Sequence, residues 1–142
     1  MADRRTADGL DFEALRRAIE RWDLDLMLGF YAEDAELSIV NAGGQQNFLF
    51  ELRGRAEIAK YLRAVFSQGA SHRVEGKDVV DEDRVSFREA CEYPDGSRVV
   101  VETILEVRDG KIMRQLDVVA RDARADREVE IDPREAKGEG LR

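Results

Sequence analysis

The chain has 142 residues, a hydrophobic fraction of 43% and a formal net charge of −8. This length suits one domain with a sizeable core, and the acidic excess argues against nucleic acid or a membrane surface as a partner, since both attract basic surfaces. The single cysteine, Cys91, excludes an internal disulfide and indicates a reducing compartment, so we expect a cytoplasmic protein.

The first half of the chain has the apolar period of helices. Phe12, Leu15, Ile19 and Trp22 fall on one face of the first predicted helix, and Asp11 is a plausible N-cap. The expected elements are a helix over 11–22, a short helix from 23 or 25 to 31, a strand over 35–40, a long connection over 41–53 and a helix over 55–66.

From residue 71 onward the apolar period changes to two, which predicts strands. We expect strands over 71–80, 84–93, 98–107 and 111–120, separated by turns rich in Asp, Pro and Gly. Helices followed by a run of strands indicate an α+β fold whose sheet curls around the helices. The domain is expected to span 10–122, and the charged stretch 123–142 is expected to be a flexible tail.

A pair of acidic residues is predicted beside the last turn. Asp109-Gly110 between two alternating apolar runs is a strong hairpin signal. A regular two-residue turn pairs Val107 with Ile112, and by the same count Glu102 with Asp117. Their carboxylates would lie side by side and share a proton, so that one donates to a substrate oxygen while the other accepts.

Two readings of this hairpin face are open. The face with Glu102 and Asp117 would be an apolar cup with a few polar groups, typical of a small-molecule pocket, and Glu89 would join it if the preceding turn keeps the register. The opposite face is more apolar, so hydropathy alone makes that face the core and leaves both acids solvated. The residues that share the acidic face by parity are Val100, Ile104, Met113, Gln115 and Val119.

No cofactor or metal is expected. The chain has no P-loop and no dinucleotide fingerprint, and its one histidine and one cysteine do not supply a zinc site. No apolar run approaches the roughly 20 residues that cross a membrane.

Several short motifs resemble one known superfamily. The runs 22–25, 30–35, 54–58 and 109–112 (WDLD, FYAEDA, GRAEI and DGKI) are similar to those of the nuclear transport factor 2-like superfamily, on its SnoaL-like branch, over residues 10–122. The resemblance implies a cone in which a strongly bent antiparallel sheet wraps around three N-terminal helices, a cystatin-like α+β roll with an internal pocket. It also implies a homodimer through the outer sheet face. Polyketide cyclases, ketosteroid isomerases, epoxide hydrolases, dehydratases and non-enzymatic binding proteins share this fold, so the fold alone does not decide the function.

The acid-base residues of these relatives carry over only in part. The three positions of the ketosteroid isomerases fall on Leu15, Ile39 and Glu102, and only the third is an acid, which disfavours that mechanism. Asp117 matches the closing-strand acid of the epoxide hydrolases and polyketide cyclases, whereas the second acid of the hydrolases falls on Ser86. The dehydratases carry a histidine at the start of the second strand, and His72 is similar to it.

His72 is the natural general acid or base, because its ordinary pKa lies near neutrality. The alternative is a strand-end histidine that bonds a nearby backbone group. Candidate catalytic residues are therefore His72, Asp117 and Glu102, and candidate ligand-binding residues are Trp22, Tyr31, Ile104, Gln115, Val119 and Phe48. Trp22 and Tyr31 are alternatively core residues, and Phe48 is a lid or a dimer contact.

The expected partner is a small hydrophobic molecule with a carbonyl or hydroxyl group. The expected chemistry is that of a cofactor-independent lyase, isomerase or cyclase. The alternative is a non-catalytic ligand-binding or dimeric scaffold protein of the same fold.

Overall fold

The structure, a computed structural model, describes residues 9–41 and 49–121. The elements in chain order are α1 (Phe12–Glu20), α2 (Leu24–Leu28), β1 (Tyr31–Asn41), β2 (Leu49–Arg53), α3 (Arg55–Phe66), β3 (Ser71–Asp81), β4 (Arg84–Glu92), β5 (Arg98–Arg108) and β6 (Lys111–Arg121). The predicted tail and Phe48 lie outside the described residues.

Aspartate caps define where the first two helices begin. The Asp11 side chain accepts a hydrogen bond from Ala14 N over 3.1 Å, and the Asp23 side chain accepts one from Leu26 N over 3.2 Å. These bonds satisfy backbone N–H groups that have no partner inside a helix. The Asp11 cap is thus confirmed, but the second helix ends at Leu28, and Tyr31 begins a strand instead of ending a helix.

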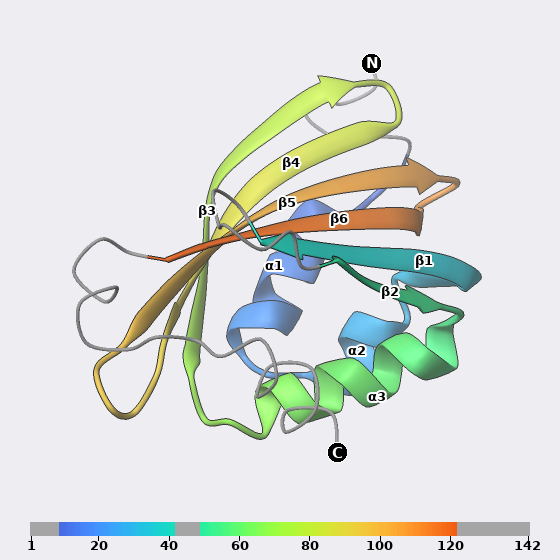
Figure 1. Ribbon diagram of the computed structural model, residues 1–142. Coiled ribbons are helices and arrows are strands. Elements are labelled where there is room, and N and C mark those ends of the chain that lie inside the picture. The colour runs from blue at the N-terminus through green and yellow to red at the C-terminus, as the bar shows by residue number, and fades with distance from the viewer. Residues whose placement is uncertain (1–8, 42–48, 122–142) are drawn as a thin grey trace.

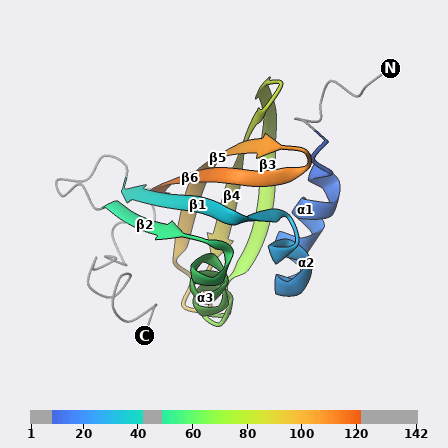
Figure 2. The ribbon, with the colours of Figure 1, turned by 90° about the vertical axis from the view of Figure 1, so that its right-hand side faces the viewer.

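The six strands form one curved, open sheet in the order β2-β1-β6-β5-β4-β3. The α+β prediction is confirmed, with two changes. The β1–β6 pair is parallel while all other pairs are antiparallel, and the stretch expected as a connection contains β2. The sheet bends around the helices, with α3 against β1 and β2 and α1 against β3 (Figures 1 and 2).

The core lies between the helices and the concave face of the sheet. Leu15, Tyr31, Leu37, Ile58, Leu105 and Ile112 are among its most completely buried side chains. Trp22 is a correction, because it follows α1 with a φ of 61° and is 43% exposed. The chain turns sharply there between the end of α1 and the Asp23 cap of α2, which carries the indole away from the buried helix face.

The last hairpin has the expected turn but not the expected register. Asp109 and Gly110 have φ of 53° and 79°, as a type I′ turn requires, and Val107 pairs with Ile112 as predicted. Directly beyond, Glu106 pairs with Arg114, so Met113 is an extra residue that forms a β-bulge.

The bulge shifts every later pair by one residue. Asp117 pairs with Thr103, and Glu102 pairs with Val118. The predicted pairing of Glu102 with Asp117 is therefore wrong. Since side chains alternate along a strand, the shift also reverses which β5 residues share a face with Asp117.

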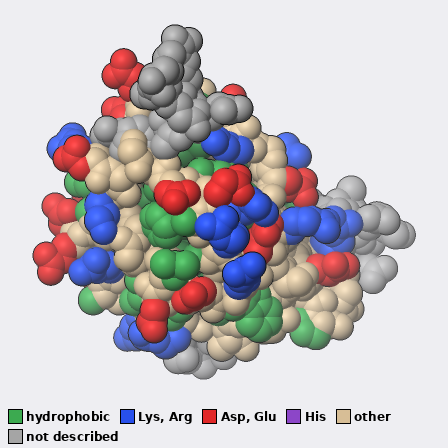
Figure 3. All heavy atoms as spheres, turned by 180° about the vertical axis from the view of Figure 1, so that it is seen from behind, with side chains coloured by type: hydrophobic (Ala, Val, Ile, Leu, Met, Phe, Trp, Pro, Cys, Tyr) green, Lys and Arg blue, Asp and Glu red, His purple; other side chains and the backbone are tan. Residues whose placement is uncertain are grey.

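Within the described ranges, none of the helices has the length and apolar character needed to cross a membrane. On the face shown in Figure 3, acidic and basic side chains are interspersed with hydrophobic ones.

Candidate acid-base site

The bulge at Met113 separates the two acids that the sequence analysis paired. Asp117 and its partner Thr103 lie on the concave face, where the Thr103 side chain is buried. Glu102 lies on the outer face, with half of its side chain exposed, and pairs with Arg88 over 2.9 Å. The structure therefore does not bring Glu102 to Asp117.

Asp117 is held by two hydrogen bonds that end on the same oxygen. Thr103 Oγ1 donates to Oδ1 over 2.9 Å, and Gln115 Nε2 donates to Oδ1 over 3.0 Å. The hydroxyl group of Tyr31 donates to Gln115 Oε1 over 2.5 Å. Side chains from β1, β5 and β6 thus converge on one carboxyl group, and Thr103 is a site residue that the sequence analysis missed.

The surroundings of Asp117 make it a group that titrates near neutrality. Burial raises its pKa to about 7, the hydrogen bond from Gln115 opposes that shift, the charge of Glu89 adds to it, and the Thr103 bond opposes it. The residue as a whole is partly buried, and the reduced hydration of its carboxyl group favours the neutral acid.

A second polar cluster lies beside it on β3 and β4. His72 Nδ1 lies 2.6 Å from Glu89 Oε2 and 3.4 Å from Cys91 Sγ. Glu89, rather than Glu102, is thus the second acid on the concave face. The sequence analysis expected Glu89 to share a face with both Asp117 and Glu102, but Glu89 pairs with Val101 and therefore lies on the opposite face from Glu102. The structure pairs His72 with a carboxylate rather than with the backbone.

The other ring nitrogen of His72, Nε2, is shielded from solvent. Nε2 is a buried atom with no hydrogen-bond partner in the described part of the chain. The rings of Trp22 and Phe66 lie edge-on to the imidazole, with centroids 6.2 and 5.2 Å away. A hydrogen on Nδ1, donated to Glu89, leaves Nε2 as a bare lone pair, which is the less costly state for an atom without a partner.

The donor atoms of His72, Glu89 and Cys91 all lie within 4.8 Å of one another, as the ligands of a metal ion do. A metal on Nδ1 would require a hydrogen on Nε2, and that buried donor would have no acceptor. Metal-bound histidines normally donate their second N–H to a partner. The hydrogen bond to Glu89 accounts for the cluster, and we assign no metal to it.

Two tyrosines share this interior. Burial raises the pKa of Tyr93 to about 12 and raises that of Tyr61 further, and the charge of Glu89 acts on both hydroxyl groups. Asp117 acts on Tyr61 as well, which places that α3 residue near the carboxyl group.

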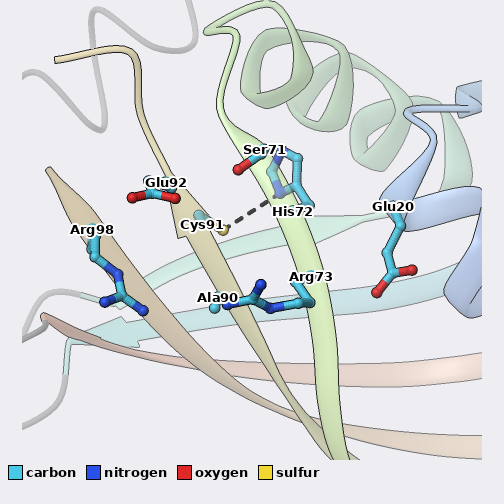
Figure 4. Close-up of a pocket in the computed structure, with 8 residues that line it drawn as sticks. All are labelled: Glu20, Ser71, His72, Arg73, Ala90, Cys91, Glu92 and Arg98. Atoms are coloured by element: carbon cyan, nitrogen blue, oxygen red, sulfur yellow. Dashed lines mark hydrogen bonds between the residues drawn. The ribbon is translucent and has the colours of Figure 1, made fainter. Parts of the chain in front are cut away.

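A pocket of about 280 Å³ lies at the β3 edge of the sheet, next to the His72 cluster (Figure 4). His72 and Cys91 belong to its wall, but Asp117 does not. The lining residues are Glu20, Ser71, His72, Arg73, Ala90, Cys91, Glu92 and Arg98. Three of these residues, Arg73, Glu92 and Arg98, are charged residues of the outer face.

Comparison with known proteins agrees with the fold described above. The profile of the SnoaL-like domain matches residues 12–115. The chain belongs to the SnoaL-like family. A comparison with curated protein sequences gives no significant match.

Solved structures similar to this SnoaL-like domain share its fold at low sequence identity. A protein assigned as a ketosteroid isomerase from Kribbella flavida is 17% identical with a TM-score of 0.62, and the match covers 86% of this chain and 87% of that one. A protein assigned as a polyketide cyclase from Xanthomonas campestris is 24% identical with a TM-score of 0.56, covering 75% and 85%. An LEH-like epoxide hydrolase of Mycobacterium tuberculosis is 22% identical with a TM-score of 0.57, covering 77% and 79%.

The remaining candidate residues of the SnoaL-like domain divide between the two faces of the sheet. Gln115 and Val119 lie on the concave face with Asp117, and Tyr31 reaches it from β1. Ile104 is a correction, since the shifted register turns it outward, where it is 38% exposed. Trp22 contacts the His72 ring.

Proposed function

We propose that this SnoaL-like domain binds a small hydrophobic molecule with a carbonyl or hydroxyl group, and that Asp117 exchanges a proton with it. The chemistry is that of a cofactor-independent lyase, isomerase or cyclase. One observation carries the proposal: Asp117 lies on the concave face with its pKa raised to about 7 by burial. Strongly perturbed groups of this kind concentrate at functional sites, and a pKa near the working pH suits a general acid or base.

In this scheme Asp117 acts in its neutral form. The carboxyl proton passes to the carbonyl or hydroxyl oxygen of the bound molecule, and Asp117 is left as a carboxylate. General acid catalysis of this type contributes about 10²–10⁴-fold in rate. Glu89 is the second carboxylate of the same face and accepts the proton that leaves carbon, with His72 acting through its 2.6 Å contact to Glu89. Glu89 then releases this proton to solvent and Asp117 takes up one proton from solvent, which restores both groups.

The experiment compares Asp117→Asn with Glu102→Gln. Glu102 is the matched control, because it is an acid on the neighbouring strand that faces outward. The probes are a β,γ-unsaturated ketone and a β-hydroxy ketone, which carry the carbonyl and hydroxyl groups of the proposed substrate, and product formation is followed by mass spectrometry at pH 6 and pH 8. Turnover by the wild type that is lost only in Asp117→Asn supports the proposal, and equal loss in both variants contradicts it.

The second candidate is a binding protein without turnover. The covered Nε2 of His72 favours it, because no acceptor of that ring is open to a bound molecule. The same probes distinguish the two candidates. Binding detected by calorimetry, without product after prolonged incubation, supports the binding protein.

A homodimer through the outer face of β5 and β6 is part of the proposal. Ile104 is 38% exposed there, and Val100, Leu116 and Val118 are partly buried on the same face. Sedimentation should show a dimer that Ile104→Lys weakens and that Glu82→Gln, in the exposed turn between β3 and β4, does not weaken. A monomeric wild type at high protein concentration would contradict this part alone.

A further inference from the structure

A short chain of side chains controls one oxygen of Asp117. The Tyr31 hydroxyl group donates to Gln115 Oε1 over 2.5 Å, and Gln115 Nε2 donates to Asp117 Oδ1 over 3.0 Å. Thr103 Oγ1 reaches the same Oδ1 over 2.9 Å. Among the described residues, the hydrogen bonds to this carboxyl group therefore all end on Oδ1.

The nitrogen and oxygen ends of the Gln115 amide have opposite effects on Asp117. With Nε2 toward the carboxyl group, the amide stabilises the carboxylate, because it donates to it. With Oε1 toward the carboxyl group, the amide would repel the carboxylate and accept a proton from the neutral acid. The orientation of this amide therefore decides which protonation state it supports and which oxygen carries the proton.

Tyr31 is placed to decide that orientation. It is 1% exposed, and burial together with the charges of Asp117 and Glu89 raises its pKa well above the ordinary range, so its hydroxyl group keeps its proton and acts as a donor. Gln115 Oε1 is the acceptor of that proton. If the amide turned, the buried Tyr31 proton would face Nε2 and lose its acceptor, which is unfavourable away from water.

We propose that Tyr31 is a positioning residue for Asp117. Its hydroxyl group keeps Gln115 Nε2 turned toward Oδ1, so that the proton of the neutral carboxyl group is carried on Oδ2, the oxygen left for a bound molecule. This inference rests on the proposed function, because the orientation of the Gln115 amide affects the reaction only if Asp117 acts as an acid. Tyr31 itself does not need to touch the bound molecule.

The test follows the titration of the Asp117 side-chain carboxyl carbon by ¹³C NMR in the full-length protein, which needs no substrate. The variants are Tyr31→Phe, Gln115→Leu and the double variant. Both single variants should raise the midpoint from about 7, by about 0.5 unit or more, because each weakens a donor to the carboxylate. The double variant should match Gln115→Leu, because Tyr31 acts only through the amide.

Tyr93→Phe is the matched control. It removes another tyrosine hydroxyl group from the same interior and leaves Tyr31 and Gln115 in place, so the midpoint should stay at the wild-type value. An unmoved midpoint in Tyr31→Phe, or additive shifts in the double variant, would overturn the positioning role. A wild-type midpoint near 4 would instead contradict the acid role in the proposed function.

The wild type offers a second measurement if the loss of a buried hydroxyl group unfolds the variant. The side-chain amide protons of Gln115 should change their chemical shifts with the same midpoint as the Asp117 carboxyl carbon. The amide proton donated to Asp117 Oδ1 should also be protected from solvent exchange, because it is hydrogen-bonded. An amide that exchanges freely and does not follow the titration would overturn the inference.

Discussion

Thr103 donates its hydroxyl proton to Asp117 across the β5–β6 pair, over 2.9 Å, as the cross-strand partner of that acid. A regular hairpin would have placed Glu102 there. Asp117 thus faces a donor instead of a second carboxylate. Asp117 therefore does not share a proton with a carboxylate on the neighbouring strand. Its pKa depends instead on its burial and on the neutral donors that bind it.

Removal of the Thr103 hydroxyl group should raise the pKa of Asp117. Thr103→Val keeps the shape but loses a donor to the carboxylate, so the neutral acid is favoured and the pKa rises above about 7, by roughly half a unit to one unit. The pH profile of any turnover should move by the same amount. Thr103→Ser keeps the hydroxyl group and should restore the wild-type midpoint, whereas a lower midpoint in Thr103→Val would contradict this account.

The free energy of unfolding should fall as the pH rises from about 4 to above 7. Asp117 binds its proton more tightly in the folded protein, where the pKa is about 7, than at its ordinary value of 3.8. Its stabilisation is complete below the ordinary value and is lost as the pH passes the folded one, a difference of at most about 4 kcal/mol. Urea unfolding at pH 5 and pH 8 measures it.

Asp117→Asn should remove most of this dependence on pH, because the amide does not ionise. At pH 8 the variant should be at least as stable as the wild type, and at pH 5 the two should differ little. Glu102→Gln should keep the wild-type slope, since its exposed pair with Arg88 is worth about 0–1 kcal/mol. Identical slopes in the wild type and Asp117→Asn would show that Asp117 is not the responsible group.

Cys91 should react slowly with thiol reagents in the folded protein. Burial and the charge of Glu89 raise the pKa of the thiol well above its usual range, and the side chain is buried. We expect labelling by a disulfide reagent to be at least about 100-fold slower than in urea, because it requires local opening. Fast labelling of the native protein, with the fold intact by circular dichroism, would contradict the packing around His72 and Cys91.

Much of the fold could be predicted because its signals are local. Asp11 caps α1 through its own side chain, and the Asp109-Gly110 turn has the two positive φ angles that this pair favours. The four alternating runs after residue 71 became β3 to β6, within one or two residues of the expected ends. The strand β2 was missed because its five residues form a strand by pairing with β1, and its own short sequence does not show that pairing.

The candidate site could be predicted only in part. Asp117 was found because it is an acid on the closing strand. Glu89 was expected to share a face with both Asp117 and Glu102, and it shares one with Asp117 but not with Glu102, because the β4–β5 register has the opposite parity from the expected one. Glu102 and Ile104 were assigned to the wrong face. Counting from a turn assumes that each residue has one partner on the neighbouring strand. The extra residue at Met113 shifts all later pairs by one, so the β5 residues that share a face with Asp117 are the opposite set from the one expected.

The amino-acid sequence by itself determined the helix starts, the turn, the strand periods and the family, since each depends on neighbours along the chain. Only the tertiary structure decided that Asp117 meets Thr103 and Gln115, that Tyr31 reaches Gln115 from β1, and that Glu89 holds His72. These contacts join strands far apart in the chain. Their strength comes from exclusion of water, which depends on what packs around a residue and not on the residues beside it in sequence.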